Sequence, residues 1–112
     1  MKKKIAIPIE NGILSEHFGH AKLFSVIQVE DGVIQKEELL VPPPHEPGSL
    51  PKWINEIGAT DVLAGGLGKK AIQLLLDNNI DVYVGVDKKK STELVQDLLN
   101  NTLSSGANYC DH

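Results

Sequence analysis

The sequence predicts an α/β fold with a mixed sheet, on two observations. A short apolar run at 62–64 is followed by a glycine-rich turn, a helical pattern and a second apolar run at 82–84. Strands this apolar are typical of parallel strands buried on both faces, so they indicate a right-handed βαβ unit. Upstream, two strand-like segments flank Asp31-Gly32, which is a strong signal for a tight hairpin turn.

The N-terminal part predicts three strands. The first covers 4–9 and reads as a buried strand. After a loop, 23–30 and 33–41 form the two arms of the hairpin. The prolines at 42–44 end the second arm, because proline donates no hydrogen bond to a sheet ladder.

Three helices are predicted from apolar residues at helical spacing. Ser49 is the expected N-cap of the first helix, and Gly58 its C′ residue. The second helix belongs to the βαβ unit and ends at Asn78-Asn79. Ser91 or Thr92 is the expected cap of the third. The expected buried stripes are Leu50, Trp53, Ile54 and Ile57; Leu67, Ala71, Leu74 and Leu75; and Leu94, Val95, Leu98, Leu99 and Leu103.

The element order is therefore β-β-β-α-β-α-β-α. Short right-handed connections arrange it as a mixed five-stranded sheet of order 3-2-1-4-5, with the second strand antiparallel and three helices. This arrangement is ribonuclease H-like. We expect a single domain over 1–112, with 104–112 as a flexible tail.

Composition narrows the function classes. The chain has 112 residues and a net charge of −4, which disfavours broad binding to nucleic acid or to anionic membranes. No apolar run approaches the roughly 20 residues that a membrane-spanning helix needs. There is one cysteine and no recognisable signal peptide, so we expect a cytoplasmic protein.

The predicted topology directs several loops to one edge of the sheet. Four of the five strands would point the same way, and ligands of open α/β sheets bind beyond the carboxyl ends of strands. Three of the four histidines, His17, His20 and His45, lie in these loops. Neutral imidazole is a common metal ligand, and His17 and His20 are three residues apart. The alternative is that one orients a loop while the other is simply exposed.

The glycine-rich turn between the first apolar run and the helix is a second candidate. Gly65, Gly66 and Gly68 direct a helix N-terminus towards this edge, where free N–H groups and the helix dipole favour an anion. Alternatively, the glycines only permit a tight turn. The spacing matches neither G-x-G-x-x-G nor a Walker loop, so it does not indicate a nucleotide. The lysines at 69–70 and 88–90 form either a basic rim or a solvated face.

The end of the chain carries a C-x-H pair, Cys110 and His112. A thiolate and an imidazole suit a soft or borderline metal, although two ligands do not specify a closed zinc site. The alternative is an unstructured tail.

Several motifs together resemble one family. They are H-F-G-H after the first strand, H-x-x-G followed by L-P-x-W-I, G-A-T-D-V-L-A-G-G-L-G-x-K-A, I-D-V-Y-V-G and a terminal N-Y-C-D-H. In these motifs the chain resembles a small stand-alone member of the dinitrogenase iron–molybdenum cofactor biosynthesis family, which contains NifX, NafY and the C-terminal part of NifB. The resemblance covers nearly the whole chain and implies a ribonuclease H-like fold.

The resemblance also implies a function. It indicates non-catalytic binding or carriage of an anionic metal–sulfur cluster, such as the iron–molybdenum cofactor or another molybdenum or iron–sulfur cluster, with donor and acceptor proteins as partners. Phe18 and Gly19 belong to the H-F-G-H motif, although Phe18 also suits a place in the core. The expected cluster-binding residues are Phe18, Gly19, Gly65, Gly66, Gly68 and Lys69, and the expected metal ligands are His17, His20, His45, Cys110 and His112.

Two other functions remain open from the sequence. In a protein-interaction or sensor module, the same loops would bind a partner and the metal would be regulatory. A ribonuclease H-like nuclease would need several carboxylates around two metals. The first strand has no interior acid, and Glu10 and Asp61 sit only at strand edges, so we expect no enzyme.

Overall fold

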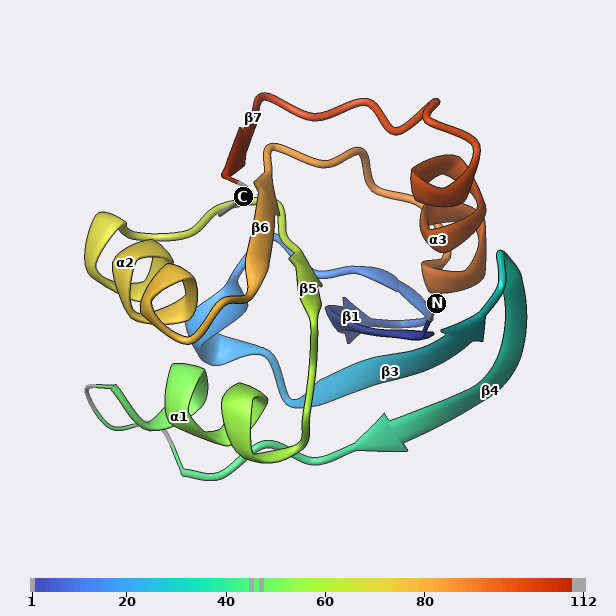
Figure 1. Ribbon diagram of the computed structural model, residues 1–112. Coiled ribbons are helices and arrows are strands. Elements are labelled where there is room, and N and C mark those ends of the chain that lie inside the picture. Colours follow the sequence, from blue (N-terminus) through green and yellow to red (C-terminus); the bar gives the residue numbers. More distant parts are fainter. Residues whose placement is uncertain (1, 45, 47, 110–112) are drawn as a thin grey trace.

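The computed structural model describes residues 2–44, 46 and 48–109. One mixed sheet runs through the molecule in the order β4-β3-β1-β5-β6-β7, and the short strand β2 pairs with β1 outside this row (Figure 1). The strands are β1 (Lys2–Glu10), β2 (Ile13–Leu14), β3 (Leu23–Glu30), β4 (Val33–Leu40), β5 (Asp61–Leu63), β6 (Asp81–Val84) and β7 (Ala107–Tyr109). The helices are α1 (Ser49–Glu56), α2 (Lys69–Asp77) and α3 (Ser91–Leu99), with a short 3₁₀ turn η1 (Phe18–His20).

The α/β class, the mixed sheet and the three helices are confirmed. β1, β5 and β6 are parallel neighbours, whereas β3 is antiparallel to both β1 and β4. The prediction of five strands was wrong, because it lacked β2 and β7. β7 pairs antiparallel with β6, so β6 is not the edge strand that the order 3-2-1-4-5 requires. Strands of two or three residues are too short to show a hydrophobic period, and they form only where a partner edge is available.

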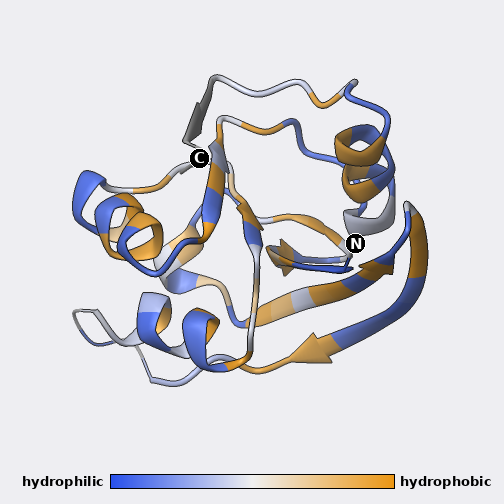
Figure 2. Cartoon of the chain, in the orientation of Figure 1, coloured by the Kyte–Doolittle hydropathy of each residue, from blue (hydrophilic) through white to orange (hydrophobic). Residues whose placement is uncertain are grey.

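Helices cover both faces of the sheet. In Figure 1, α1 and α2 lie on one side and α3 on the other. The side chains of β1 divide accordingly: Ala6 belongs to the cluster under α1 and α2, and Ile5 and Ile7 to the cluster under α3. Figure 2 shows hydrophobic residues concentrated on the strands and on the helix sides that face them. Burial on both faces explains why the central strands are apolar throughout.

Aromatic packing fixes the position of η1 against the sheet. The fully buried Phe24 makes edge-to-face contacts with Phe18, at a ring-centroid distance of 5.7 Å, and with Trp53, at 5.4 Å. Phe18 is itself buried, so the centre of H-F-G-H anchors this turn in the core. Trp53 packs against the same cluster from α1.

The predicted turn residues are confirmed, whereas the predicted N-caps of the first and third helices are wrong. Asp31 and Gly32 have φ values of 52° and 79°, as a tight hairpin turn requires, and Gly58 has a φ of 82° just beyond α1. Ser49, however, is the first residue of α1, and Gly48 is its N-cap. The Ser49 hydroxyl instead donates to the carbonyl of Glu46 at 2.8 Å, which turns it back towards the preceding loop.

The third helix also begins and ends differently from the prediction. Its N-cap is Lys90, not Ser91 or Thr92. The Ser91 hydroxyl donates to Glu37 Oε2 at 2.6 Å, a contact with β4 that local sequence does not reveal. The helix ends at Leu99, so Leu103 packs on the core from the following loop. Likewise, α2 begins at Lys69, which leaves Leu67 before the helix.

Among the described residues, no helix is long and apolar enough to cross a membrane.

Candidate functional site

Strand direction gathers four loops at one edge of the sheet. β1, β5 and β6 run parallel, and β4 has the same direction because it is antiparallel to β3. The segments that follow these strands therefore meet at one edge, which is where a ligand binds in open α/β sheets. Within the described part of the chain they are residues 11–22, 41–44, 46, 48, 64–68 and 85–90.

The short turn η1 presents the two histidines of H-F-G-H. His17 is its N-cap, and the His20 N–H donates to the His17 carbonyl at 3.3 Å. His17 precedes the turn in an extended conformation, and His20 is the last residue of the turn. Both histidines are exposed, while Phe18 between them is buried. The burial of Phe18 thus directs the two imidazoles outward.

These histidines lie beside the glycine-rich turn. A hollow of about 360 Å³ separates η1 from the start of α2 and is lined by residues of both segments. We call it the histidine–glycine hollow. Its lining residues are Glu16, His17, Phe18, Gly19, His20, Gly66, Leu67, Gly68 and Ala71. Gly65 and Lys69 are predicted site residues that do not line it.

The three glycines of the turn have different roles. A Cβ on Gly65 would be 3.6 Å from both the Glu16 Cα and the Ser15 carbonyl oxygen, so this residue packs against the segment before His17. Gly68 has a φ of −69° and no atom within 4 Å of a Cβ position. Neither the backbone nor the packing of the chain therefore requires glycine at 68. A methyl group there would occupy open space at the mouth of α2.

The N-terminus of α2 has backbone hydrogen-bond donors that the helix itself leaves unpaired. Gly68 is the N-cap and supplies no side-chain oxygen, and the first helical bond joins the Ile72 N–H to the Gly68 carbonyl at 3.0 Å. The N–H groups of Lys69, Lys70 and Ala71 consequently have no acceptor within the helix, and the helix dipole adds positive charge there. Such an end favours an anion.

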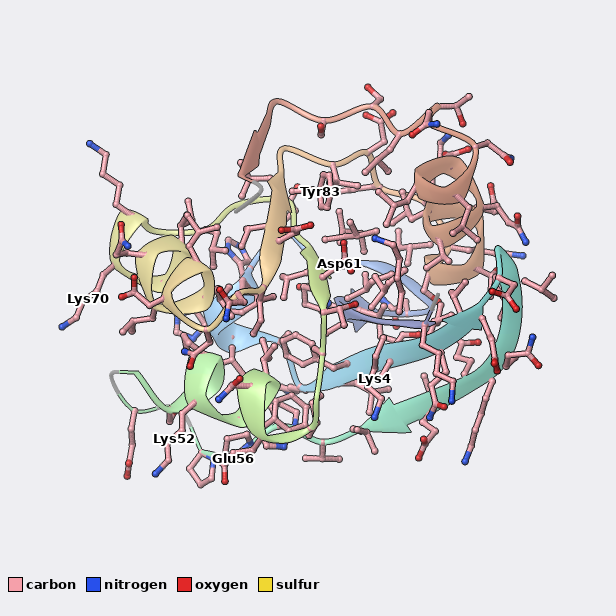
Figure 3. All side chains as sticks on the ribbon, viewed as in Figure 1. Lys4, Lys52, Glu56, Asp61, Lys70 and Tyr83 are labelled. Atoms are coloured by element: carbon pink, nitrogen blue, oxygen red, sulfur yellow. The ribbon has the colours of Figure 1, made fainter. Side chains whose placement is uncertain are left out.

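The lysines around this edge fall into two groups. Lys69 and Lys70 are exposed on the first turn of α2, and Figure 3 shows Lys70 projecting outward from that helix. Lys89, in contrast, pairs with Asp97 of α3 at 3.0 Å, and this contact raises the pKa of the lysine. Lys88 bonds to the carboxylate of Glu16. The run 88–90 is thus partly engaged within the protein rather than forming a continuous basic rim.

Glu16 is a residue of the hollow that the sequence did not single out. The hydrogen bond from Lys88 and the charge of that ammonium lower the pKa of the Glu16 carboxyl group. Its place before His17 was visible, but its partner lies 72 positions further along the chain. No local pattern reveals such a pair.

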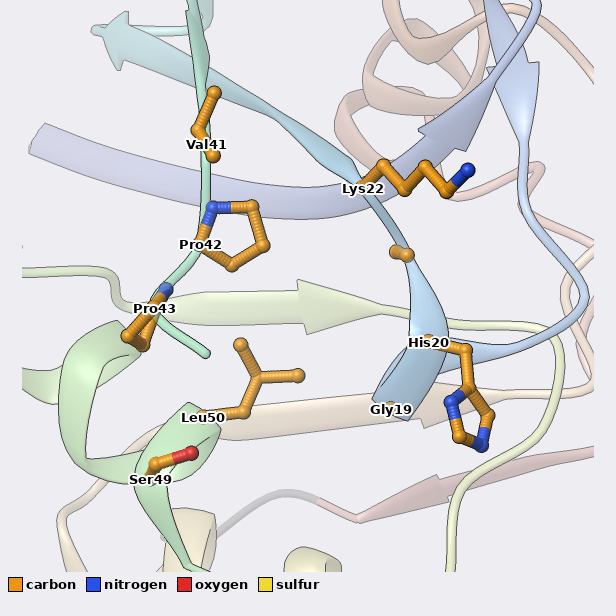
Figure 4. A pocket seen from close by; sticks show the side chains of 9 residues that line it. Gly19, His20, Lys22, Val41, Pro42, Pro43, Ser49 and Leu50 are labelled. Atoms are coloured by element: carbon orange, nitrogen blue, oxygen red, sulfur yellow. The ribbon is translucent and has the colours of Figure 1, made fainter. Parts of the chain in front are cut away.

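A second hollow adjoins the first, and Figure 4 shows it from close by. We call it the proline hollow; its volume is about 310 Å³. Val41, Pro42, Pro43 and Leu50 supply apolar walls, and the imidazole of His20 extends away from the prolines (Figure 4). Val41 is 76% exposed. An apolar surface therefore shares this hollow with His20.

The described residues hold no group of three or more histidine, cysteine, aspartate or glutamate side chains arranged to bind a metal ion. His17 and His20 supply two donors. Three other expected ligands, His45, Cys110 and His112, lie outside the described residues.

The C-terminal segment returns to the same edge. The Gly106 N–H donates to the Val84 carbonyl at 2.8 Å, and the Gly85 N–H to the Gly65 carbonyl at 2.9 Å. β7 then pairs with β6, with Ala107 opposite Val84. Residues 107–109 thus form a strand, where the sequence suggested a flexible tail.

A buried carboxylate lies at the opposite edge. Asp61 is the first residue of β5 and pairs with Ile5, far from the C-terminal end of β1. It is 1% exposed, and burial raises its pKa. Thr60 donates to Oδ1 at 2.6 Å, while Lys3 Nζ lies 3.5 Å from Oδ2. Oδ2 accepts no hydrogen bond from the part of the chain that the structure describes.

Comparison with known proteins assigns the family. Residues 1–101 match the model of the family described as "Dinitrogenase iron-molybdenum cofactor". The chain belongs to this family. A curated relative, the uncharacterized protein MJ0580 of Methanocaldococcus jannaschii, is 32% identical over an alignment of 85 residues that covers 71% of this chain and 72% of the relative.

Solved structures share the fold of this chain. The crystal structure of PH0822 has a TM-score of 0.85 and 28% identity, over 92% of this chain and 94% of that one. The apo form of the orange protein from Desulfovibrio gigas has the same fold, with a TM-score of 0.80 and 23% identity over 97% of each chain. The family is of a cofactor-binding or carrier type and is linked to cofactor biosynthesis.

Proposed function

We propose that this protein carries an anionic metal–sulfur cluster, such as the iron–molybdenum cofactor, one of its precursors or another molybdenum or iron–sulfur cluster. It binds and delivers the cluster without converting it chemically. One observation carries the proposal: two exposed histidines face an uncapped helix N-terminus across a single hollow.

The lining of the histidine–glycine hollow suits such a cargo. His17 and His20 supply imidazole nitrogens, which are suitable ligands for iron and copper. The free N–H groups at the start of α2 suit the negative charge of a metal sulfide. At Gly68 the missing side chain leaves the backbone accessible. Lys69 adds a positive charge at the same helix end.

The carrier role requires a donor and an acceptor protein. The proline hollow supports this part of the proposal, because the exposed Val41 and His20 line the same hollow. The same surface favours a second candidate function, a protein-interaction or sensor module in which the bound metal is regulatory. The two functions differ in whether the metal-free protein binds its partner.

The arrangement gives no support to the nuclease alternative. Glu10 ends β1 at the loop edge, whereas Asp61 pairs with Ile5. Five residues of strand, or about 16 Å, separate these two positions. A nuclease with two catalytic metals needs carboxylates that bind both ions, and these ions lie about 4 Å apart.

Tetrathiomolybdate, a dianionic molybdenum sulfide, provides the test. We expect the wild-type protein to bind it anaerobically with a shift in its visible absorption bands. We expect H17A/H20A to bind much more weakly, because both imidazoles are lost. N55A, which changes an exposed residue of α1, is the matched control and should bind normally. Undiminished binding by the double variant would exclude the histidines from the site.

A further inference from the structure

An ion pair lies at the rim of the histidine–glycine hollow. Glu16 lines the hollow, and its carboxylate bonds to the ammonium group of Lys88. Glu16 precedes His17, and its backbone packs beside Gly65 and Gly66. The pair therefore lies between the histidines, the glycine-rich turn and the loop after β6. A negative ligand in the hollow would meet one fixed carboxylate and one nearby cation.

The ion pair is easily exchanged. The side chains of Lys88 and Glu16 are 53% and 60% exposed. An exposed pair of this kind contributes little to stability, because water screens both charges. A ligand that carries more negative charge than one carboxylate can thus displace Glu16 from Lys88 with little loss of free energy.

The backbone that carries Lys88 is held in place. The Leu14 N–H donates to the Lys89 carbonyl at 3.0 Å, and Ile13 forms a bridge with Lys90. β2 thereby fixes the 88–90 loop beside the segment that leads into η1. If the ammonium group of Lys88 separates from Glu16, it can contact only groups close to the hollow.

We propose that Lys88 is an anion-binding residue of this site and that Glu16 is its resting partner, which the bound anion displaces. The inference rests on the proposed carrier function and adds a release device to it. With the site empty, Lys88 neutralises Glu16. With cargo bound, Glu16 competes for Lys88 and keeps the affinity low enough for transfer to an acceptor.

The test compares dissociation constants for tetrathiomolybdate in low-salt anaerobic buffer. We expect K88Q to weaken binding about fivefold and E16Q to tighten it about fivefold, the upper range for an exposed pair. K90Q is the matched control, since it removes the same charge from the same loop, and it should change the constant less than twofold. High salt should reduce all of these differences.

The outcomes separate the inference from the proposed function. If K88Q and K90Q weaken binding equally, only diffuse charge matters and the assignment of Lys88 is wrong. If E16Q leaves binding unchanged or weakens it, Glu16 is not a competitor. If the wild-type protein does not bind the probe at all, the carrier function itself fails, and this inference fails with it.

Discussion

Gly85 controls how closely the C-terminal segment can approach the sheet. It has a φ of 68°, and a Cβ there would lie 2.8 Å from the Gly106 nitrogen and 3.0 Å from its Cα. Both atoms are backbone, so neither can turn aside. In G85A, the left-handed conformation costs about 1 kcal/mol. Displacing Gly106 also breaks its hydrogen bond to Val84 and frays β7, which adds about 2 kcal/mol.

G32A is the matched control, because Gly32 has a φ of 79° but nothing within 4 Å of its Cβ position. We expect a free energy of unfolding about 3 kcal/mol lower in G85A and about 1 kcal/mol lower in G32A. Urea titration followed by the fluorescence of the single tryptophan, Trp53, measures both. Hydrogen exchange should also show faster exchange at Gly106 in G85A. Equal destabilisation of the two variants would refute the close contact.

Three further predictions concern the core, the site and the buried acid. F24A should lower the free energy of unfolding by about 3–5 kcal/mol, measured by urea titration, because Phe24 is fully buried between two aromatic rings. G68A should change stability little, since the entropy gain from alanine at a φ of −69° is offset by the lower preference for alanine at an N-cap, yet it should weaken tetrathiomolybdate binding by placing a methyl group in the hollow; unchanged binding would place the ligand elsewhere. Burial raises the pKa of Asp61, so the folded protein keeps the Asp61 carboxyl group protonated to higher pH than the unfolded chain does. The free energy of unfolding therefore falls as the pH rises from about 3.9, the pKa of an unfolded aspartate, to the raised pKa. In D61N this loss should disappear, so the variant gains stability relative to the wild type across that range, as thermal unfolding at a series of pH values would show.

Periodicity was sufficient to predict the elements with a long repeat. α1 buries the apolar stripe that its spacing indicated, and the Asp31-Gly32 turn joins β3 to β4. α2 instead buries Ile72 and Leu75, whereas Ala71 and Leu74 of the predicted stripe are only partly buried. The rule for parallel strand ends also predicted that H-F-G-H and the glycine-rich turn would lie at one edge, and both line one hollow. The role of these residues in binding stays a prediction.

The missed features depend on contacts between distant segments. β7 has three residues and forms because the backbone of Gly85 admits Gly106, a contact between positions 21 residues apart. The ion pair of Glu16 with Lys88 and the hydrogen bond of Ser91 to Glu37 likewise join remote segments. Local propensity reports none of these contacts, because each is decided by how the loops pack.

The most direct test of the carrier function is metal and acid-labile sulfide analysis, with a visible spectrum, of protein purified anaerobically from the cells that make it. The account predicts molybdenum, iron or copper together with sulfide near stoichiometry, and their loss in H17A/H20A prepared in the same way. A colourless, metal-free wild-type protein that also fails to bind supplied clusters would contradict it.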